Sequence, residues 1–376
     1  MKKLLPLIAI ATMTIVSCTP SVKTLKNLSI EHETEYGGIY IHKTIEEFND
    51  YGYACGDSVN IKFTNGVELK DLPYYNGYYV NAGEILLVGY PGYDYIKVAV
   101  NYGDDIWETG HFTDDVLATI SLNKKAKYKD VQDASDIHYY DERERYTSDE
   151  EFANYRNVKV GDIKDDILYR SASPCNNEHK RAHFVDSLMA NDGVQFIMNL
   201  ADTDAKIQGY IAKEDFNSPY FLSLYQKAQL FMSFGDDDKV TPLAMNMNYT
   251  SKEFGEKVAS GFAAMSKHDG PYLVHCLEGK DRTGFVLMVV EALLNASYQE
   301  IIDDYMMTYQ NYYGIRKGDA KYATIKDHNI DQMLSFITDG ADYTKVELSS
   351  YAKSYLLRGG MTEAEINTLI NKLKQA

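Results

Sequence analysis

The stretch Tyr272-Leu273-Val274-His275-Cys276-Leu277-Glu278-Gly279-Lys280-Asp281-Arg282-Thr283-Gly284 decides the fold of the second part of the chain. Its first three residues form a short apolar run that predicts a buried strand, and the apolar run after Gly284 is long enough for a buried helix. The loop between them therefore ends at a helix N-terminus, where free N–H groups and the helix dipole favour an anion. Gly279 and Gly284 relieve steric limits where the backbone turns its amides toward an oxyanion.

Cys276 and Arg282 stand in this loop with the chemistry of phosphoryl transfer. A thiol beside a helix N-terminus and cations favours the thiolate, the form that attacks. Arginine offers a planar fork that suits two oxygens of one phosphate. Together they predict a site in which sulfur takes the phosphoryl group directly, with no metal needed. A buried structural cysteine beside a surface charge cluster is the alternative, but it leaves the order Cys, Gly, Arg and helix unexplained.

The motif His275-Cys276-x-x-Gly279-Lys280-Asp281-Arg282-Thr283-Gly284 resembles the phosphate loop of the cysteine-dependent protein tyrosine phosphatases. More narrowly, it resembles the bacterial tyrosine and lipid phosphatases that carry Lys-Asp-Arg in this loop. Upstream, Asn154-Tyr155-Arg156 is similar to that family's Asn-Phe-Arg segment, and Ile167-Leu168-Tyr169-Arg170-Ser171 to its Leu-Tyr-Arg-Ser strand. Downstream, Glu300-Ile301-Ile302-Asp303-Asp304-Tyr305 and Met307-Thr308-Tyr309 are similar to the helix after the loop. The resemblance spans about Glu151 to the C-terminus.

The resemblance implies an α/β phosphatase domain over residues 151–376, which hydrolyses phosphomonoesters through a cysteinyl-phosphate intermediate without a cofactor. Cys276 would be the nucleophile, Arg282 would bind the phosphate, and the Thr283 hydroxyl would assist the sulfur as it leaves. His275 would orient the loop by its ring N–H. The remaining substrate-binding residues would be Leu277, Glu278, Gly279, Lys280, Gly284, Arg156 and Arg170.

The general acid has several candidates. A cysteine-dependent hydrolysis needs a group that protonates the departing oxygen and later a base for water. The resemblance to the bacterial group suggests Asp281 for this role. Other tyrosine phosphatases place the aspartate on an upstream mobile loop, for which the candidates are Asp202 and Asp204, and the run Asp236, Asp237 and Asp238. No Trp-Pro-Asp occurs, and we therefore prefer Asp281.

Length and charge limit the remaining possibilities. At 376 residues the chain exceeds one typical domain, and we expect two. The formal net charge of −17 argues against nucleic acid or an anionic membrane surface as a partner. A polyanionic substrate would have to rely on a local positive pocket. Four cysteines, at positions 18, 55, 175 and 276, are too few for a disulfide scaffold.

Residues 1–18 are typical of a secretory signal. Lys2 and Lys3 precede an apolar run that reaches Val16, which is too short for a membrane span. Ile15-Val16-Ser17-Cys18 resembles a bacterial lipoprotein box, in which the cysteine becomes the lipidated first residue. An ordinary signal peptide with an incidental cysteine is the alternative. We therefore expect a protein anchored to a bacterial membrane through Cys18, facing the periplasm or the cell surface, with 19–28 as a spacer.

Residues 29–128 have a mostly period-two pattern that predicts a small β domain, a sandwich or a barrel. Around Thr64-Asn65-Gly66, a three-residue loop with Gly66 left-handed places Phe63 opposite Val67 and Ile61 opposite Leu69. Further strands are expected at 85–88, 95–100 and 117–122. The stretch 129–150 is expected to be a charged linker.

The catalytic domain is expected to alternate strands and helices, with the phosphate loop at the carboxyl end of a central strand. Strands are predicted at 167–170 and 194–200, and a helix at 178–190. Ser218-Pro219 predicts an N-cap and first turn. Capping boxes are predicted at Thr250-x-x-Glu253, Ser297-x-x-Glu300 and Thr362-x-x-Glu365.

Three functions compete. We expect a protein tyrosine phosphatase. The alternative within enzymes is a phosphoinositide or inositol polyphosphate phosphatase, which would need more basic residues at the pocket. The alternative of another class is a catalytically weak phosphate-binding module, against which the presence of Cys276, Asp281, Arg282 and Thr283 counts. Cys175 is a further hypothesis, either as a redox partner that forms a reversible disulfide with Cys276 or as a small packed residue.

Overall fold

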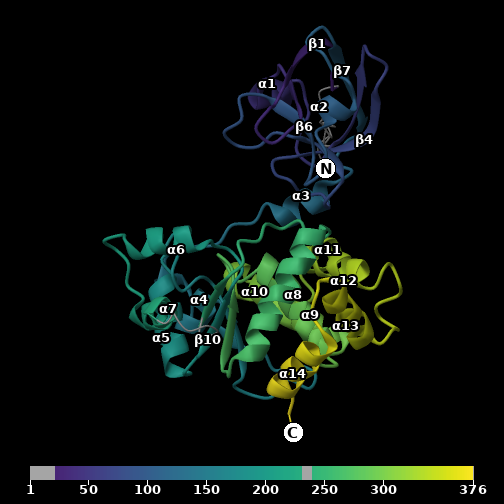
Figure 1. The fold of residues 1–376 in the computed structure, drawn as a ribbon. Coiled ribbons are helices and arrows are strands. Elements are labelled where there is room, and N and C mark those ends of the chain that lie inside the picture. The colour runs from purple at the N-terminus through teal and green to yellow at the C-terminus, as the bar shows by residue number, and fades with distance from the viewer. Residues whose placement is uncertain (1–21, 231–238, 376) are drawn as a thin grey trace, which may run out of the picture. The chain divides into compact units, whose positions relative to one another are not determined.

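The computed structural model describes residues 22–230 and 239–375, so Cys18 and Asp236 lie outside the described residues. The chain divides into two compact units (Figure 1). The first comprises residues up to Tyr78 together with Ile85–Ala99 and Asp104–Tyr128, and the second comprises Tyr79–Glu84, Val100–Gly103 and the residues from Lys129 onward. Among the described residues, no helix combines the length and the apolar character that crossing a membrane requires.

The first unit contains a closed β barrel, one of the two architectures that the period-two pattern predicts. Its strand order is β1-β2-β6-β5-β4-β3-β7. The first strand begins at Leu25, inside the stretch expected to be a spacer. The elements are β1 (Leu25–His32), β2 (Ile39–Ile41), α1 (Ile45–Asp50), β3 (Ser58–Phe63), β4 (Glu68–Tyr75), β5 (Ile85–Val88), β6 (Ile96–Val100), α2 (Ile106–Thr109) and β7 (Leu117–Lys124).

The β3–β4 hairpin has the predicted register. Ile61 pairs with Leu69 across the two strands, and the Phe63 amide donates to the Val67 carbonyl at 2.9 Å. Gly66 has a φ of 96°, in the left-handed region that glycine adopts without steric cost. The three-residue loop is therefore confirmed.

The second unit has a five-stranded sheet in the order β11-β10-β12-β9-β8, in which only the β8–β9 pair is antiparallel. The strands are β8 (Arg156–Asn157), β9 (Leu168–Ser171), β10 (Phe196–Asn199), β11 (Val240–Pro242) and β12 (Tyr272–His275). The helices are α3 (Lys129–Ser135), the 3-10 helix Arg143–Arg145, α4 (Asp149–Ala153), α5 (Ala182–Asn191), α6 (Asp204–Ile211), α7 (Pro219–Leu230), α8 (Lys252–Lys267), α9 (Asp281–Leu293), α10 (Tyr298–Tyr313), α11 (Ala320–His328), α12 (Ile330–Ile337), α13 (Leu348–Arg358) and α14 (Glu363–Leu373).

Helices cover both faces of this sheet. Successive side chains of a strand point to opposite faces, so each strand contributes to the cores on both sides. In β12, Tyr272 and Val274 belong to a core with α8, α9 and the later helices, whereas Leu273 belongs to a core with α5, α6 and α7. The two groups of helices lie on opposite sides of β10 in Figure 1. The chain therefore forms the predicted α/β domain, with helices on both faces of a largely parallel sheet.

The parallel strands end in one row. His275 of β12 pairs with Ser171 of β9 and with Asn199 of β10, and Asn199 pairs with Pro242 of β11. In open α/β sheets, ligands bind outside the carboxyl ends of the strands. The loop from Cys276 to Lys280 begins at this edge and leads into α9.

Two helix starts agree with the sequence pattern and two differ in detail. The capping boxes at Ser297 and Thr362 begin α10 and α14 as predicted. The predicted box at Thr250 is wrong by one residue, because Ser251 caps α8 by accepting from the Phe254 amide. Pro219 is the first residue of α7, as predicted, but the Ser218 hydroxyl has no partner among the described residues. A carboxylate from α5, Asp186, instead accepts from the Tyr220 and Phe221 amides at 3.2 and 2.7 Å.

The stretch 129–150 is more structured than a linker. It contains α3 and a 3-10 helix, and it belongs to the second unit. Ala134 of α3 is buried in the core to which α9, α10 and α11 also contribute. Side chains between α3 and the 3-10 helix also reach the catalytic loop.

Candidate active site

The backbone carbonyls of the loop 276–280 are all held by donors. His275 Nδ1 lies 3.0 Å from the Cys276 oxygen, the Ser173 amide donates to Leu277 at 3.0 Å, and the Gly284 amide donates to Lys280 at 2.8 Å. The Glu278 oxygen accepts from the Tyr312 hydroxyl and from Asn154 Nδ2, and the Gly279 oxygen accepts from Arg170 Nη2 and Asn154 Nδ2. Five successive carbonyls are therefore fixed by groups of the protein.

The backbone amides of the same loop are left for a ligand. Within the described parts of the chain, no acceptor is found for the amides of residues 277–283. The last three belong to the first turn of α9, where helix amides have no intrahelical partner. A run of unpaired amides at a helix N-terminus is an anion-binding arrangement.

Gly279 is required where it stands. Its φ is 69°, and an added Cβ would lie 2.2 Å from the Ser171 carbonyl oxygen at the end of β9. Gly284 has a different role from the predicted one, since it lies within α9. A Cβ there would meet the Tyr305 ring of α10 at 2.5 Å, so Gly284 permits close packing of two helices.

Cys276, the predicted nucleophile, begins the loop, and Thr283 lies just beyond its end in α9. Cys276 is 3% exposed and directly follows β12, and its thiol is not in a disulfide. Thr283 is fully buried in the first turn of α9, and no partner for its hydroxyl is found among the described residues. An unpartnered buried hydroxyl is costly, and it is explained by a group that arrives with the substrate or the reaction.

His275 is neutral and orients the loop. Because the Cys276 carbonyl can only accept, the proton must be on Nδ1. Burial lowers the pKa of His275 to about 4, which removes it as a cationic group at neutral pH. The ring therefore holds the loop by its N–H, in the role that the resemblance implies.

Arg282 lies in the first turn of α9 and is partly exposed. Its Nη1 donates to the Met245 carbonyl at 2.9 Å, in the segment that follows β11. This contact ties one nitrogen of the fork to the protein. The described residues provide no carboxylate that forms an ion pair with Arg282, in contrast with the other cations of the site.

Asp281, Lys280 and Glu278 form a cluster at the mouth of the loop. Lys280 Nζ lies 3.1 Å from Glu278 Oε2 and 3.8 Å from Asp281 Oδ2. Partial burial raises the pKa of Asp281, whose side chain is 45% exposed, and the Glu278 charge adds to this effect while Lys280 and Arg282 oppose it. A raised pKa favours the protonated carboxyl that a general acid needs. Lys280 is not a free positive charge at the rim, because Glu278 and Asp281 both face it.

Arg156 and Arg170, predicted to contact substrate, instead support the back of the loop. They are direct cross-strand neighbours on β8 and β9, where like charges normally repel. Asp304 of α10 relieves this repulsion, with Oδ1 2.9 Å from Arg156 Nε and Oδ2 bound to Arg170 Nη1. Burial alone would raise the pKa of Asp304, but the two arginines outweigh burial and hold the pKa well below its usual range.

Glu291 of α9 completes this buried group. Burial and the nearby Asp304 raise the pKa of Glu291 well above its usual range, which favours the neutral carboxyl. Asp304 is therefore the carboxylate that faces the two guanidinium groups. Arg170, which is 1% exposed, donates from Nη2 to the Gly279 carbonyl and is thus part of the loop's support.

The alternative general acids either bind other side chains or lie outside the described residues. Asp204 is an exposed residue at the first position of α6, and it accepts from the Tyr225 hydroxyl at 3.2 Å. Asp202 is buried, and it binds Asn199 Nδ2 and the Tyr210 hydroxyl, each at 3.1 Å. Asp236 and its two acidic neighbours are not among the described residues.

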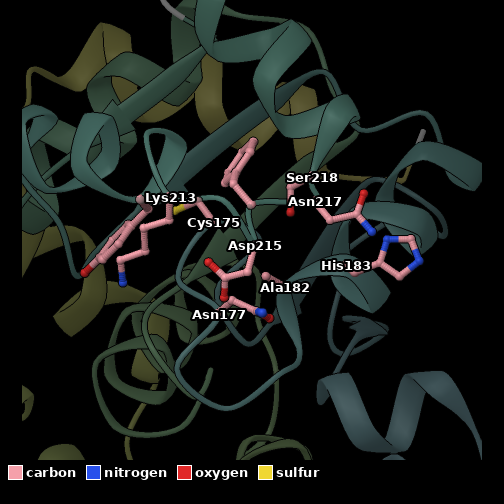
Figure 2. Close-up of a pocket in the computed structure, with 10 residues that line it drawn as sticks. Cys175, Asn177, Ala182, His183, Lys213, Asp215, Asn217 and Ser218 are labelled. Carbon is pink, nitrogen blue, oxygen red and sulfur yellow. The ribbon is translucent and has the colours of Figure 1, made fainter.

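Cys175 faces a different environment from that of the loop. Its sulfur lies 3.5 Å from Ser173 Oγ and 4.0 Å from Asn199 Nδ2, and burial raises its pKa to about 12. Figure 2 shows Cys175 at a pocket with Lys213 and Asp215, and no residue of the loop 276–280 lines that pocket. A buried thiol with a raised pKa is a poor attacking group. The described contacts therefore favour the packing role over the redox role.

Several residues of the site were not predicted as such. Asn154 and Asp304 stand in segments that resemble the phosphatases, but nothing in the sequence connects them to loop carbonyls or to paired arginines. Tyr312 and Tyr139 carry no motif at all. The available signal was the positive charge of the two arginines. Two arginines on paired strands require a carboxylate nearby.

The chain was compared with known families and proteins. A family described as "Tyrosine phosphatase family" matches residues 151–375, which is more than half of the chain. A solved structure of the core catalytic domain of the PP-IP phosphatase SIW14 from S. cerevisiae, in complex with citrate, is similar over 50% of this chain and 94% of that chain, with 17% identity and a TM-score of 0.27. No curated protein matches. The chain belongs to the tyrosine phosphatase family and is a cysteine-dependent phosphatase.

Proposed function

We propose that the protein hydrolyses phosphotyrosine in other proteins through a cysteinyl-phosphate intermediate, without a bound metal. One observation carries the proposal. The loop 276–280 has its carbonyls bound by the protein and its amides unpaired, with Cys276 at one end and Arg282 at the other. The amides, the helix dipole and the guanidinium supply the positive charge that a metal otherwise supplies to phosphoryl oxygens.

The first step transfers the phosphoryl group to sulfur. The Cys276 thiolate attacks phosphorus, a sulfur–phosphorus bond forms, and the bond from phosphorus to the ester oxygen breaks. Asp281 gives its proton to the departing oxygen, so the alcohol leaves neutral. Arg282 and the loop amides hold the equatorial oxygens, on which the negative charge is spread.

The second step releases phosphate. Asp281, now a carboxylate, accepts a proton from water as the water oxygen attacks phosphorus. The sulfur–phosphorus bond breaks, and the electron pair returns to Cys276 as thiolate. The Thr283 hydroxyl, which has no partner among the described residues, donates to this sulfur and stabilises the departing charge.

The charges around the loop favour a substrate with a single phosphate. Lys280 faces Glu278 and Asp281, and the two arginines behind the loop share Asp304. Arg282 is thus the cation at the loop that has no carboxylate in an ion pair within the described chain. Inositol polyphosphates carry further phosphates that need further cations. This balance supports phosphotyrosine over the inositol phosphate alternative.

The test is an assay of the purified mature protein on a phosphotyrosine peptide and on inositol phosphates of increasing phosphate number. We expect the peptide to have the larger kcat/KM and chelator to leave the rate unchanged. A preference for the polyphosphates would favour the alternative substrate class. Equal weak activity of wild type and Cys276→Ser on every substrate would favour a phosphate-binding module.

We also propose that the protein acts outside the cytoplasm on a lipid anchor at Cys18. The support is the sequence of residues 1–18 alone, a basic start and an apolar run that ends in Ser17-Cys18. Mass spectrometry of the N-terminal peptide from membranes tests this proposal. A lipidated Cys18 supports it, and an unmodified peptide cleaved elsewhere contradicts it.

A further inference from the structure

Tyr139 contacts the catalytic loop from outside the family-matched region, which begins at residue 151. Its hydroxyl donates to Glu278 Oε1 at 2.9 Å and lies 3.1 Å from His179 Nε2. Its ring stacks on Tyr312 of α10, with centroids 5.0 Å apart and planes 30° apart. Tyr312 in turn donates to the Glu278 carbonyl at 2.7 Å. Both ends of Glu278, side chain and backbone, are therefore held by this tyrosine pair.

Arg181 fixes the segment that carries Tyr139. Its guanidinium carbon lies 4.7 Å from the centroid of the Tyr139 ring, and the side chain is buried. Its nitrogens donate to Asp141 Oδ1, the Tyr140 carbonyl and the Phe152 carbonyl, each at 2.9 Å. A buried, fully bonded arginine costs several kcal/mol to disturb, which makes the position of Tyr139 well defined.

A chain of contacts leads from Tyr139 to the proposed general acid. Glu278 uses its second oxygen on Lys280 Nζ, and Lys280 also faces Asp281 Oδ2 at 3.8 Å and donates to the Tyr313 hydroxyl at 3.2 Å. Lys280 is thus shared between two carboxyl groups. A change in the interaction between Glu278 and Lys280 therefore changes the electrostatic potential at Asp281.

We propose that Tyr139 is a positioning residue that sets the working pH range of Asp281 by sharing Glu278 with Lys280. The proposal rests on the proposed function, in which Asp281 is the acid. The charged and titratable groups that face Asp281 are Lys280, Glu278 and Arg282, together with Tyr305 and Tyr309 of α10. Of these, Glu278 is the one that Tyr139 contacts directly.

The direction of the effect follows from electrostatics. The Tyr139 hydroxyl satisfies part of the Glu278 charge. Without it, Glu278 draws Lys280 closer, Asp281 loses part of the cation that lowers its pKa, and the acid stays protonated to higher pH. Removal of the Glu278 charge does the opposite, since Lys280 then has Asp281 as its remaining carboxyl partner.

The test is the pH profile of kcat/KM for Tyr139→Phe and Glu278→Gln, with Tyr140→Phe as the matched control. Tyr140 stands beside Tyr139, but the residue is 53% exposed, and its ring lies against Arg145, with the guanidinium carbon 3.9 Å from the ring centroid. We expect the alkaline limb to move up by roughly half a pH unit in Tyr139→Phe and down by a similar amount in Glu278→Gln. The control should superimpose on wild type.

The outcomes separate this inference from the proposed function. Profiles of Tyr139→Phe and wild type that superimpose would overturn the inference while leaving Asp281 as the acid. A lower rate at every pH with an unmoved limb would also overturn it and indicate a structural role. If Asp281→Asn keeps the alkaline limb, the proposed acid itself is wrong. Melting curves check that the ring stack, which phenylalanine retains, keeps the fold intact.

Discussion

The outer face of the loop 276–280 presents carbonyl oxygens, and each accepts a hydrogen bond from a side chain or amide of the surrounding elements. We call the other groups of the loop the inner face: the amides of residues 277–283, the Cys276 sulfur and the Thr283 hydroxyl. Within the described chain neither these amides nor this hydroxyl has a partner. The two faces belong to the same few residues. They differ in that one is bonded in the folded protein and the other awaits a ligand.

This difference explains why the loop amides remain available to bind an anion. A loop with unpaired amides tends to rotate its peptides and satisfy them internally, because an unpaired buried donor is costly. Bonds to the carbonyls prevent that rotation, since each peptide plane carries both groups. The arginine and asparagine behind the loop thus contribute to catalysis by fixing dipoles before the substrate arrives.

Loss of the nucleophile on the inner face should have the largest effect. We expect Cys276→Ser to reduce turnover by roughly 10⁴-fold or more, because the hydroxyl is a far weaker nucleophile than the thiolate. Binding of inorganic phosphate, measured by calorimetry, should persist because the amides and Arg282 remain. Turnover near that of wild type would contradict the assignment of the Cys276 sulfur as the nucleophile on the inner face.

Loss of the acid should depend on the leaving group. We expect Asp281→Asn to lower kcat/KM by roughly 10²–10⁴ on phosphotyrosine, and much less on an activated aryl phosphate that leaves without a proton. The raised pKa of Asp281 keeps the acid protonated to higher pH, and activity falls as pH rises through that pKa. The variant should therefore lack the alkaline limb.

Asp204→Asn and Asp236→Asn are the matched controls for this prediction. Both are expected to retain the wild-type dependence on the leaving group. A larger loss in either control than in Asp281→Asn would move the acid to an upstream loop.

The two arginines, one on each face, should respond differently to the same substitution. Arg282→Lys removes a two-oxygen fork from the inner face, and we expect a loss of roughly 10²–10³ in kcat with stability nearly unchanged. Arg170→Lys breaks a buried fork that joins Asp304 to Gly279, and we expect it to destabilise the protein by about 3 kcal/mol. Denaturant unfolding and kinetics on both variants measure the contrast. Equal stability of the two variants would contradict it.

The smallest effect concerns His275 and acid stability. Its pKa is lowered to about 4 in the folded chain, against an ordinary value of 6.5. Above pH 6.5 the ring is neutral in both states, and between pH 6.5 and 4 only the unfolded state takes up the proton. Unfolding free energy should therefore fall by up to about 3 kcal/mol on acidification through this window. His275→Asn should lose that slope, and an unchanged slope would contradict the assignment.

The local patterns of the sequence were enough for much of the fold. The β3–β4 register followed from the alternation around Gly66, and the starts of α10 and α14 followed from their capping boxes, because these features depend on neighbours within a few residues. The strand before Cys276 and the helix after it followed from the apolar runs. For α7 the Ser218-Pro219 pattern gave the correct start, but the side chain that binds its first amides, Asp186, comes from elsewhere in the chain.

By itself the sequence determined the chemistry of the loop. Cys276, Gly279 and Arg282 lie within seven residues, so they stay close together whatever the tertiary packing. Only the tertiary structure decided what stands behind the loop. Arg156, Arg170 and Asp304 are far apart in the chain, and as single residues the arginines were predicted to bind substrate. Their pairing comes from strand register and from the approach of α10, which are set by long-range packing. The physical reason is that the role of a buried charged residue depends on its ion-pair partner, and folding alone brings that partner close.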